Sequence, residues 1–250
     1  MTIVAGIHAV AEYLRSSPER VLRLSVQRDR RDEALSNLIR IARDNDIQVT
    51  QVSRDALNRI SEGTVHQGIA AQCQEFQPRS EAEFEALFDS LDDPLLFAIE
   101  GVQDPRNLGA CLRSAAGAGV DAVLLPRNRS APLSSAAFKS ASGALSSLFI
   151  VGVANLARRM EWLQERGVWV VGTDDQAPKQ YTDYDYGSST LVVVGSEDTG
   201  LRALTKDRCD ALVSIPMAGR VPSLNVSVAS GIVLYECVRQ RTLRDTPSNH

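Results

Sequence analysis

The second part of this 250-residue chain alternates short apolar runs with segments of helical periodicity, and this alternation limits its possible folds more than any other feature. Apolar runs of strand length occur at residues 95–100, 122–125, 148–153, 168–172, 190–194 and 212–215. Helical spacing occurs at residues 108–118, 134–144, 156–166, 201–206 and 226–241. Continuous apolar strands that alternate with helices predict an α/β fold with a mostly parallel sheet covered on both faces. We therefore expect ligands beyond the carboxyl ends of the strands.

The first part of the chain predicts a smaller α/β unit without a chemical motif of its own. Strands are expected at residues 22–26, 47–52 and 69–73, and a helix at residues 35–42. His8 and His66 are the only histidines of this unit. We interpret both as structural or capping residues rather than as catalysts.

Between these two parts, residues 77–93 carry one basic and six acidic side chains. This composition is typical of a linker with a short acidic helix that ends near Pro94. We therefore expect four segments along the chain. They are a small domain at 1–76, an acidic linker at 77–93, a large domain at 94–241 and a flexible tail at 242–250.

The formal net charge of −4 lies almost wholly in the acidic linker. Residues 1–76 hold ten basic and ten acidic side chains, and residues 94–250 hold sixteen basic and fifteen acidic ones. Of the 27 basic residues, 24 are arginines, which bind phosphate bidentately and stack on bases. A codon preference for arginine is the alternative explanation. The net charge therefore does not exclude an RNA partner.

Location and metal content are constrained by what the chain lacks. The longest apolar runs are strand-sized, far short of the roughly 20 residues of a transmembrane helix, and the N-terminus has no basic region of a signal peptide. The four cysteines stand far apart, without a C-x-x-C pair or a histidine cluster. We therefore expect reduced thiols in the cytoplasm, no membrane association and no metal site.

One glycine motif suggests a nicotinamide cofactor but stands in the wrong place. Residues 117–122 match G-x-G-x-x-A, which binds a dinucleotide only when a strand precedes it and a helix follows. Here the expected helix comes first and the strand follows. We interpret these glycines as a helix stop and turn, which disfavours a nicotinamide oxidoreductase.

Three predicted strand ends are rich in glycine, asparagine, serine and charge. The first covers residues 100–113, where Asn107 can cap the next helix and Arg113 lies about two turns further on. A helix start with arginines is typical of a phosphate site. The second covers residues 194–201, where Glu197 stands between two glycines that allow the backbone to approach a ligand closely.

The third strand end covers residues 215–229. An apolar wall that includes Ile215 and Met217 leads into Ser223 and Asn225, at the start of a helix of small residues. Each candidate alone has a purely structural alternative: a helix cap, a surface charge or a loop carboxylate.

Taken together and in this order, the three segments resemble the signature motifs of the SPOUT (SpoU/TrmH) class of RNA ribose 2′-O-methyltransferases. The matched patterns are N-x-G-A-x-x-R, G-x-E-x-x-G and I-P-M-x-G-x-x-x-S-L-N-V-S-V-A. Residues 6–10 and 65–68 also resemble the bacterial members that methylate a guanosine ribose in the peptidyl-transferase region of 23S ribosomal RNA. The resemblance covers nearly the whole chain except the tail. One departure is Pro222, which stiffens a loop where smaller residues without proline are expected.

The resemblance implies a catalytic domain with a deep C-terminal trefoil knot, preceded by a small RNA-binding domain similar to ribosomal protein L30e. It implies S-adenosylmethionine as cofactor, 23S ribosomal RNA as partner, and a homodimer whose active site borrows from both subunits. By position, the implied cofactor-binding residues are Gly195, Ile215 and Leu224, with Met217 nearby. The implied catalytic residues are Asn107, Arg113, Glu197, Ser223 and Asn225.

Roles for these residues follow from the reaction, an in-line methyl transfer to a ribose hydroxyl. A guanidinium is a poor base because it stays protonated. Arg113 is therefore expected to grip the RNA phosphate and the 2′-oxygen, with Glu197 orienting Arg113 or Asn107. Ser223 and Asn225 are expected to position ribose or cofactor.

Two alternatives remain open within this resemblance. The first is the same chemistry on another ribosomal RNA site or on tRNA, and the extra N-terminal domain disfavours the minimal tRNA enzymes. An RNA-binding protein that has lost catalysis is disfavoured by the retained Arg113, Glu197 and Asn225.

Overall fold

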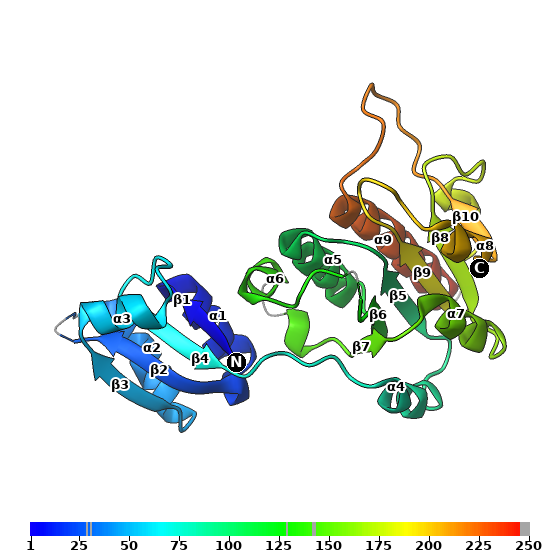
Figure 1. The fold of residues 1–250 in the computed structure, drawn as a ribbon. Coiled ribbons are helices and arrows are strands. Elements are labelled where there is room, and N and C mark those ends of the chain that lie inside the picture. Colours follow the sequence, from blue (N-terminus) through cyan, green and yellow to red (C-terminus); the bar gives the residue numbers. More distant parts are fainter. Residues whose placement is uncertain (29, 31, 129, 142–143, 246–250) are drawn as a thin grey trace. The chain divides into compact units, whose positions relative to one another are not determined.

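The structure is a computed structural model that describes residues 1–28, 30, 32–128, 130–141 and 144–245 (Figure 1). The chain divides into two compact units. The first unit consists of Met1–Gln77 together with Leu133–Ser146, and the second of Pro78–Pro132 together with Ser147–His250.

The first unit is built on a four-stranded sheet in the order β1-β4-β2-β3, in which only β2 and β3 run parallel. Its strands are β1 (Thr2–Ala5), β2 (Val21–Gln27), β3 (Gln48–Val52) and β4 (Ile69–Cys73). Its helices are α1 (Ile7–Ser16), η1 (Pro18–Arg20), α2 (Glu33–Asp44) and α3 (Arg54–Ile60), followed after the insertion point by α6 (Ser135–Ala141) and η2 (Ala144–Ser146). Leu24, Leu35, Leu57 and Ile69 are fully buried and form its core.

Helix α6 belongs to the first unit, although the sequence pattern assigns residues 134–144 to the large domain. Phe138 is buried and stacks on Tyr13 of α1, with ring centroids 4.7 Å apart. The physical reason is that the aromatic side chain of α6 is buried by packing against α1. Helical periodicity predicts that such a face exists, but not which surface will cover it.

The second unit contains a six-stranded, fully parallel sheet in the order β10-β8-β9-β5-β6-β7. Its strands are β5 (Leu95–Ile99), β6 (Ala122–Pro126), β7 (Ile150–Val153), β8 (Trp169–Thr173), β9 (Thr190–Val194) and β10 (Ala211–Val213). Its helices are α4 (Glu81–Phe88), α5 (Pro105–Gly117), α7 (Leu156–Gln164), η3 (Tyr181–Asp183), α8 (Ala203–Asp207) and α9 (Val226–Asp245). Every residue of β5 and β9 is buried, which confirms the predicted α/β fold with a parallel sheet covered on both faces.

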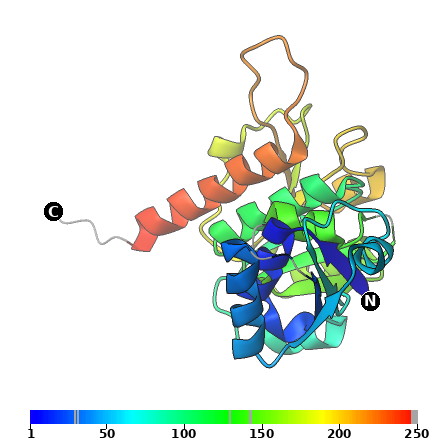
Figure 2. The ribbon, with the colours of Figure 1, turned by 90° about the vertical axis from the view of Figure 1, so that its left-hand side faces the viewer.

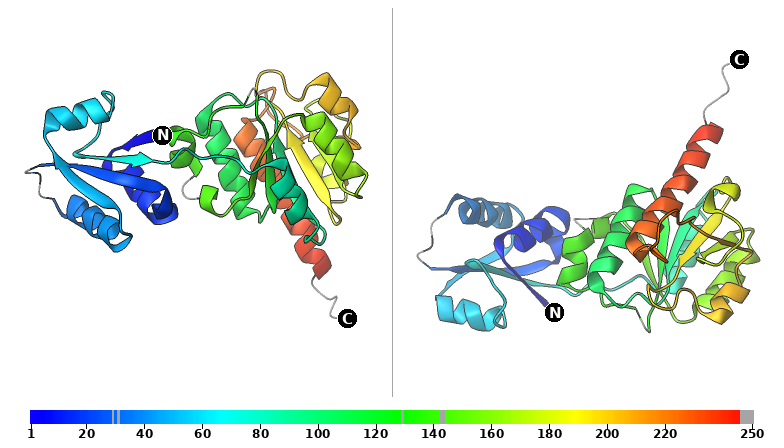
Figure 3. Two further views of the ribbon diagram at one scale, coloured as in Figure 1. Left: turned by 60° about the horizontal axis from the view of Figure 1, so that its bottom comes forward. Right: turned by 90° about the horizontal axis from the view of Figure 1, so that it is seen from above.

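Helices cover this sheet in two layers. Phe84 of α4 and Met160 of α7 share a buried cluster with alternate strand residues such as Leu96. Because strand side chains alternate between faces, the remaining strand residues point to the opposite face. Helices α5 and α9 pack against each other and α9 lies against β9 (Figure 3). The loop that joins β10 to α9 extends away from the sheet (Figures 1 and 2).

Two of the boundaries that the structure corrects concern the predicted site and the predicted tail. Helix α5 begins three residues earlier than expected, at Pro105, and the carboxylate of Asp104 caps it by accepting from the backbone N–H of Arg106 at 2.9 Å. Asn107 is therefore not the cap, because proline at the first helical position moves the cap to the residue before it. Helix α9 continues to Asp245, so residues 242–245 are helical rather than part of a tail. The rest of the predicted tail, 246–250, lies outside the described residues.

The glycines of the G-x-G-x-x-A segment act as a helix stop, as predicted. Helix α5 ends at Gly117, and Gly119 follows with φ of 67°, the left-handed conformation that commonly terminates helices. Strand β6 comes after this turn. A dinucleotide phosphate would therefore meet no helix N-terminus here.

The stretch expected to be an acidic linker contains α4, which is integrated into the second unit. Phe84 is fully buried, and Arg159 of α7 donates to Glu85 at 2.7 Å and to Glu81 at 3.1 Å through Nε. Its guanidinium lies 4.7 Å from the ring centre of Trp162. Burial raises the pKa of Glu81, but the N–H of Ala154 and the charge of Arg159 outweigh it and hold that pKa below its usual value.

Replacing Arg159 by methionine is therefore expected to lower the free energy of unfolding of the second unit by about 2 kcal/mol. The loss stays below the ~3–5 kcal/mol of a fully buried pair because both carboxylates are partly exposed. Both tryptophans, Trp162 and Trp169, lie in this unit, so urea unfolding followed by their fluorescence reports it selectively. Arg158→Met, at an exposed position of the same helix, is the control. Equal midpoints for the two variants would contradict a stabilising role of the cluster.

The four cysteines are free thiols. Burial raises the pKa of Cys73 to about 12 and that of Cys111 to about 11. Among the described residues, no three His, Cys, Asp or Glu side chains are grouped so that they could hold a metal ion. In the same part of the chain, no helix combines the length and the apolarity needed to cross a bilayer.

Candidate active site

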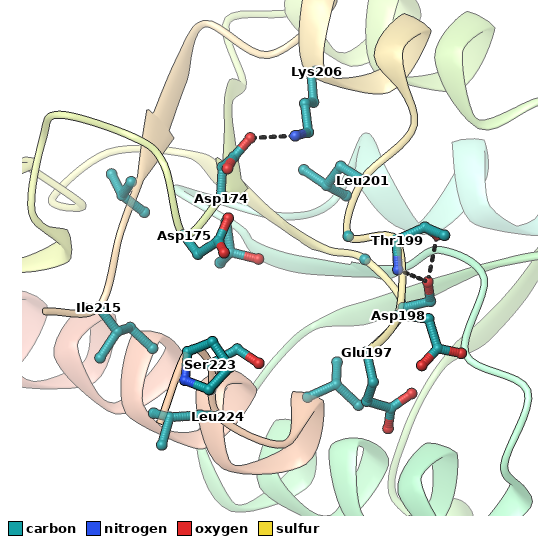
Figure 4. Close-up of a pocket in the computed structure, with 18 of the residues that line it drawn as sticks. Asp174, Asp175, Glu197, Asp198, Thr199, Leu201, Lys206, Ile215, Ser223 and Leu224 are labelled. Carbon is teal, nitrogen blue, oxygen red and sulfur yellow. Dashed lines mark hydrogen bonds and ion pairs between the residues drawn. The ribbon is translucent and has the colours of Figure 1, made fainter. Parts of the chain in front are cut away.

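A cavity of about 340 Å³ opens beyond the carboxyl ends of β8, β9 and β10 (Figure 4). The lining comes from the end of β8 with the two residues after it, from the 195–201 loop after β9, from Lys206 of α8, and from the segment between β10 and the first turn of α9. The lining residues that the sequence singles out are Gly195, Glu197, Ile215, Met217, Ser223 and Leu224. The cavity thus lies at the edge of the sheet where the topology predicts a ligand.

A chain of hydrogen bonds joins the three sequence motifs beside this cavity. Asn107, in the first turn of α5, donates through Nδ2 to Glu197 of the loop after β9. Asn225 donates through Nδ2 to Oδ1 of Asn107 at 3.2 Å. The Oδ1 of Asn225 in turn accepts from the backbone N–H of Ser227 at 3.0 Å and from its hydroxyl at 2.6 Å. Each amide is therefore held in one orientation by a partner on either side.

Asn225 serves two purposes in this arrangement. By accepting from the N–H of Ser227 it caps the N-terminus of α9, as the structural alternative predicts. Its amide nitrogen is directed to Asn107 at the same time. The cap therefore fixes the start of α9 relative to the start of α5.

The loop after β9 closes on itself, and Gly195 makes this closure possible. Ser196 and Gly200 exchange two backbone hydrogen bonds, of 3.2 and 3.0 Å. A Cβ atom at position 195 would overlap the backbone of Gly200 and Leu201. The sequence suggests that this glycine allows backbone to approach a ligand, whereas in the structure the close approach is within the loop itself.

The wall of the cavity on the β10 side is apolar. Ile215, Met217 and Leu224 are half-buried lining residues, and Pro222 lies in the same wall. Ile215 and Leu224 face the cavity across from Asp198 and Thr199 of the β9 loop (Figure 4). The cavity therefore pairs an apolar side with a polar, acidic side.

Two lining residues that we did not single out from the sequence form an ion pair at the cavity edge. Asp174 follows β8, and its carboxylate pairs with Lys206 of α8 (Figure 4). Burial raises the pKa of Asp174. The hydrogen bonds from Lys206 and from the N–H of Gln176 lower it by more, so the pKa lies below its usual value. The signal available in the sequence was the pair Asp174-Asp175 directly after a predicted strand.

Glu100, directly after β5, is a third residue without a predicted role. Its side chain is buried, accepting from the N–H of Arg202 at 3.1 Å and from the hydroxyl of Thr205 at 2.9 Å. These bonds fix the start of α8, the helix that carries Lys206. Glu100 is therefore a positioning residue for the cavity edge.

The remaining two candidates are less enclosed. Arg113 is exposed on α5, outside the set of described residues that line the cavity. Ser223 lines the cavity with an exposed side chain. The structure therefore joins Asn107, Glu197 and Asn225 by direct contact and brings Ser223 to the same cavity.

These features define a class: an α/β protein that binds an organic ligand in a half-apolar, half-acidic cavity at the carboxyl ends of parallel strands. The model of the SpoU rRNA Methylase family matches residues 94–235. A second model, described as RNA 2′-O ribose methyltransferase substrate binding, matches residues 3–79. This chain belongs to the SpoU rRNA methylase family, as its three motifs predict.

Relatives of known name are similar over almost their whole length. The 23S rRNA (guanosine-2′-O-)-methyltransferase RlmB of Escherichia coli K12 is 44% identical over 240 residues, covering 96% of this chain and 99% of that protein. The RlmB protein of Yersinia pestis is 45% identical over 242 residues, covering 97% and 98%.

Solved structures share the fold. The SpoU methyltransferase AviRb from Streptomyces viridochromogenes, in complex with AdoMet, superimposes with a TM-score of 0.75 at 25% identity and covers 96% of this chain and 90% of AviRb. The A. aeolicus TrmH/SpoU tRNA modifying enzyme has a TM-score of 0.54 at 27% identity. The superimposed region covers 66% of this chain and 85% of the A. aeolicus chain.

Proposed function

We propose that this protein transfers the methyl group of S-adenosylmethionine to the ribose 2′-hydroxyl of a guanosine in 23S ribosomal RNA. The observation that carries the proposal is the hydrogen-bonded chain from Glu197 through Asn107 to Asn225, which unites the three motifs beside one cavity. The names of the RlmB relatives support the substrate, and the AdoMet complex of AviRb supports the cofactor.

The cavity suits this cofactor in size and in chemistry. Its volume of about 340 Å³ falls within the range of pockets that hold small organic ligands. Ile215, Met217 and Leu224 offer the apolar surface that a purine ring needs, and the Gly195 loop offers backbone polar groups. When bound, S-adenosylmethionine supplies a methyl group that is electrophilic because it sits on a sulfonium.

The residues of this chain then have to orient a ribose and assist the loss of one proton. The 2′-oxygen forms a bond to the methyl carbon, the carbon–sulfur bond breaks with its electron pair on sulfur, and the hydroxyl proton leaves to phosphate or water. We assign Arg113 to the RNA phosphate and the developing charge on the 2′-oxygen. We assign Asn107, Ser223 and Asn225 to positioning, with Glu197 holding Asn107.

A labelling experiment tests this function directly. Purified protein is incubated with methyl-labelled S-adenosylmethionine and ribosomal RNA that lacks the modification, and the labelled nucleotide is then mapped. We expect label on the ribose of a single guanosine of 23S RNA. Label in tRNA would assign the same chemistry to another substrate, and no transfer despite cofactor binding would indicate a catalytically silent RNA-binding protein.

Three finer features belong to the same proposal. We infer a trefoil knot in the second unit from its likeness to the SpoU family, and an L30e-like fold of the first unit, which has a four-stranded mixed sheet. We also infer that the protein acts in the cytoplasm, in keeping with its free cysteines and its ribosomal substrate.

The protein is expected to be a homodimer. Val228, Tyr235 and Leu243 of α9 are each at least half exposed, and their spacing of seven and eight residues places them along one stripe of the helix. A second copy that packs on this stripe would remove it from water. Light scattering at micromolar concentration should give about twice the chain mass of 27.2 kDa. A monomer that retains full methyl transfer at high dilution would contradict an active site shared between subunits.

A further inference from the structure

The first unit contains a cavity of its own, of about 500 Å³, and none of the three motifs contributes to it. It lies between the end of β2, helix α3 and the loop before β4. Its lining consists of Gln27, Arg30, Arg54, Asn58 and residues 63–68. A concave site of this size on a small domain is large enough for an organic ligand.

A buried histidine builds the floor of this cavity. His66 is 8% exposed; its Nδ1 accepts from the N–H of Gly68 at 3.0 Å, and its Nε2 lies 2.9 Å from Oδ1 of Asn58. Since Nδ1 is an acceptor, Nε2 carries the proton and donates to Asn58. His66 is thus structural, as the sequence suggests. The hydrogen bond from His66 uses the side-chain oxygen of Asn58. Because the side chain of Asn58 is exposed, its amide nitrogen is the group that can donate to a ligand.

Two arginines line this cavity, and one of them, Arg30, forms an ion pair with Asp32. Arg30 lies across Gly68, where a Cβ atom would come within 2.7 Å of its Cδ, and Asp32 holds its Nε at 2.9 Å. Arg54, the first residue of α3, is exposed and also lines the cavity. Burial lowers the pKa of His66, and the charges of Arg54 and then Arg30 lower it further. Both guanidinium charges are therefore close enough to influence His66.

The rim adds an apolar surface beside these charges. Val65 is 79% exposed, and two further residues of its loop, Gln67 and Gly68, have positive φ, of 49° and 84°. The side chain of Gln67 accepts from the N–H of Ile7 at 3.1 Å, so the loop is tied to the start of α1. The exposed valine is thus presented by a loop that this bond ties to the start of α1.

We propose that this cavity binds one unpaired nucleotide of the substrate RNA, with its phosphate on Arg30 and Arg54 and its base against Val65 near the amide of Asn58. The proposal rests on the function proposed above and adds the recognition site. Guanidiniums bind phosphate, and an apolar rim beside an amide suits a base. A base within a duplex must give up its pairing and stacking before it can enter a cavity, whereas an unpaired base does not pay this cost, and sequence-specific proteins read RNA mostly through unpaired bases.

The first test compares two full-length double variants with the same change of charge. Arg30→Gln with Arg54→Gln removes both guanidiniums of the cavity, and Arg40→Gln with Arg43→Gln removes two exposed guanidiniums of α2. Filter binding to a 23S RNA transcript that the wild type methylates should show about 10- to 100-fold weaker affinity for the cavity variant alone. The slope of the logarithm of its RNA affinity against the logarithm of the salt concentration should become less steep, by about 0.7 for each lost phosphate contact with single-stranded RNA. Cofactor affinity should stay unchanged, because the cofactor cavity is lined by residues of the second unit.

The second test does not depend on the stability of those variants. The photoreactive substitution Val65→p-benzoylphenylalanine in the full-length protein should crosslink to a single unpaired nucleotide of the transcript. Crosslinks scattered along the RNA, or none, would overturn the proposal. So would equal RNA affinity of the two double variants, or a defect of the cavity variant only on ribosomal particles, which would point to a protein partner. Failure of the proposed function is distinct, because the wild type would then transfer no methyl group.

Discussion

Replacing Arg113 by alanine is expected to slow methyl transfer by about 100- to 1000-fold, the usual effect of removing a charged group that stabilises a transition state. Arg113 stands on α5, six residues after Asn107, while the cavity is lined by the segments after β8, β9 and β10. Cofactor affinity should therefore remain close to that of the wild type. Single-turnover methylation separates the rate from RNA binding, and calorimetry measures the cofactor.

The control for this experiment is Arg158→Ala, which removes an exposed guanidinium from α7, a helix without any of the three motifs. It should retain the wild-type rate. Wild-type turnover in Arg113→Ala as well would show that Arg113 is a surface charge and that the proposed role is wrong. An equal loss in both variants would indicate a general dependence on positive charge instead.

Replacing Gly195 by alanine is expected to weaken cofactor binding by about 10- to 100-fold, which corresponds to the ~1–3 kcal/mol that overpacking usually costs. The added Cβ would overlap the backbone of Gly200 and Leu201, and backbone cannot move aside as a side-chain tip can. The loop would have to open, and Glu197, which it carries, would shift from Asn107. Calorimetry with S-adenosylmethionine measures the effect.

Gly219→Ala is the matched control, because it makes the same substitution in the loop before α9 where a Cβ would meet nothing within 4 Å. Its cofactor affinity should equal that of the wild type. If Gly195→Ala binds as tightly as Gly219→Ala, then the closure of the β9 loop does not support the cofactor cavity.

Much of the second unit could be predicted from local pattern. The apolar run 190–194 is β9 to the residue, because a strand buried on both faces has to be apolar throughout. Helix boundaries were less accurate where capping decides them. At Asp104-Pro105 the proline moved the start of α5 ahead of the apolar periodicity, so Asn107 lies inside the first turn, where it donates to Glu197, and is not the cap.

The candidate site was predictable to a similar degree. The motif residues at three strand ends converge because parallel strands end at one edge of the sheet, and Asn107, Glu197 and Asn225 do meet there. The pair Asp174 and Lys206 escaped prediction because its members are 32 residues apart and only the order of the sheet makes them neighbours.

By itself the sequence determined the α/β class, the sheet edge that carries the site and, through its motifs, the methyltransferase family. These depend on periodicity and on residues near strand ends, which are local properties of the chain. Only the tertiary structure decided that α6 joins the first unit, that α4 is part of the second and that His66 supports a cavity beside Arg30 and Arg54. The reason is that the sequence of a helix or strand determines that its apolar face must be buried, while the packing of the whole chain determines which other element covers that face.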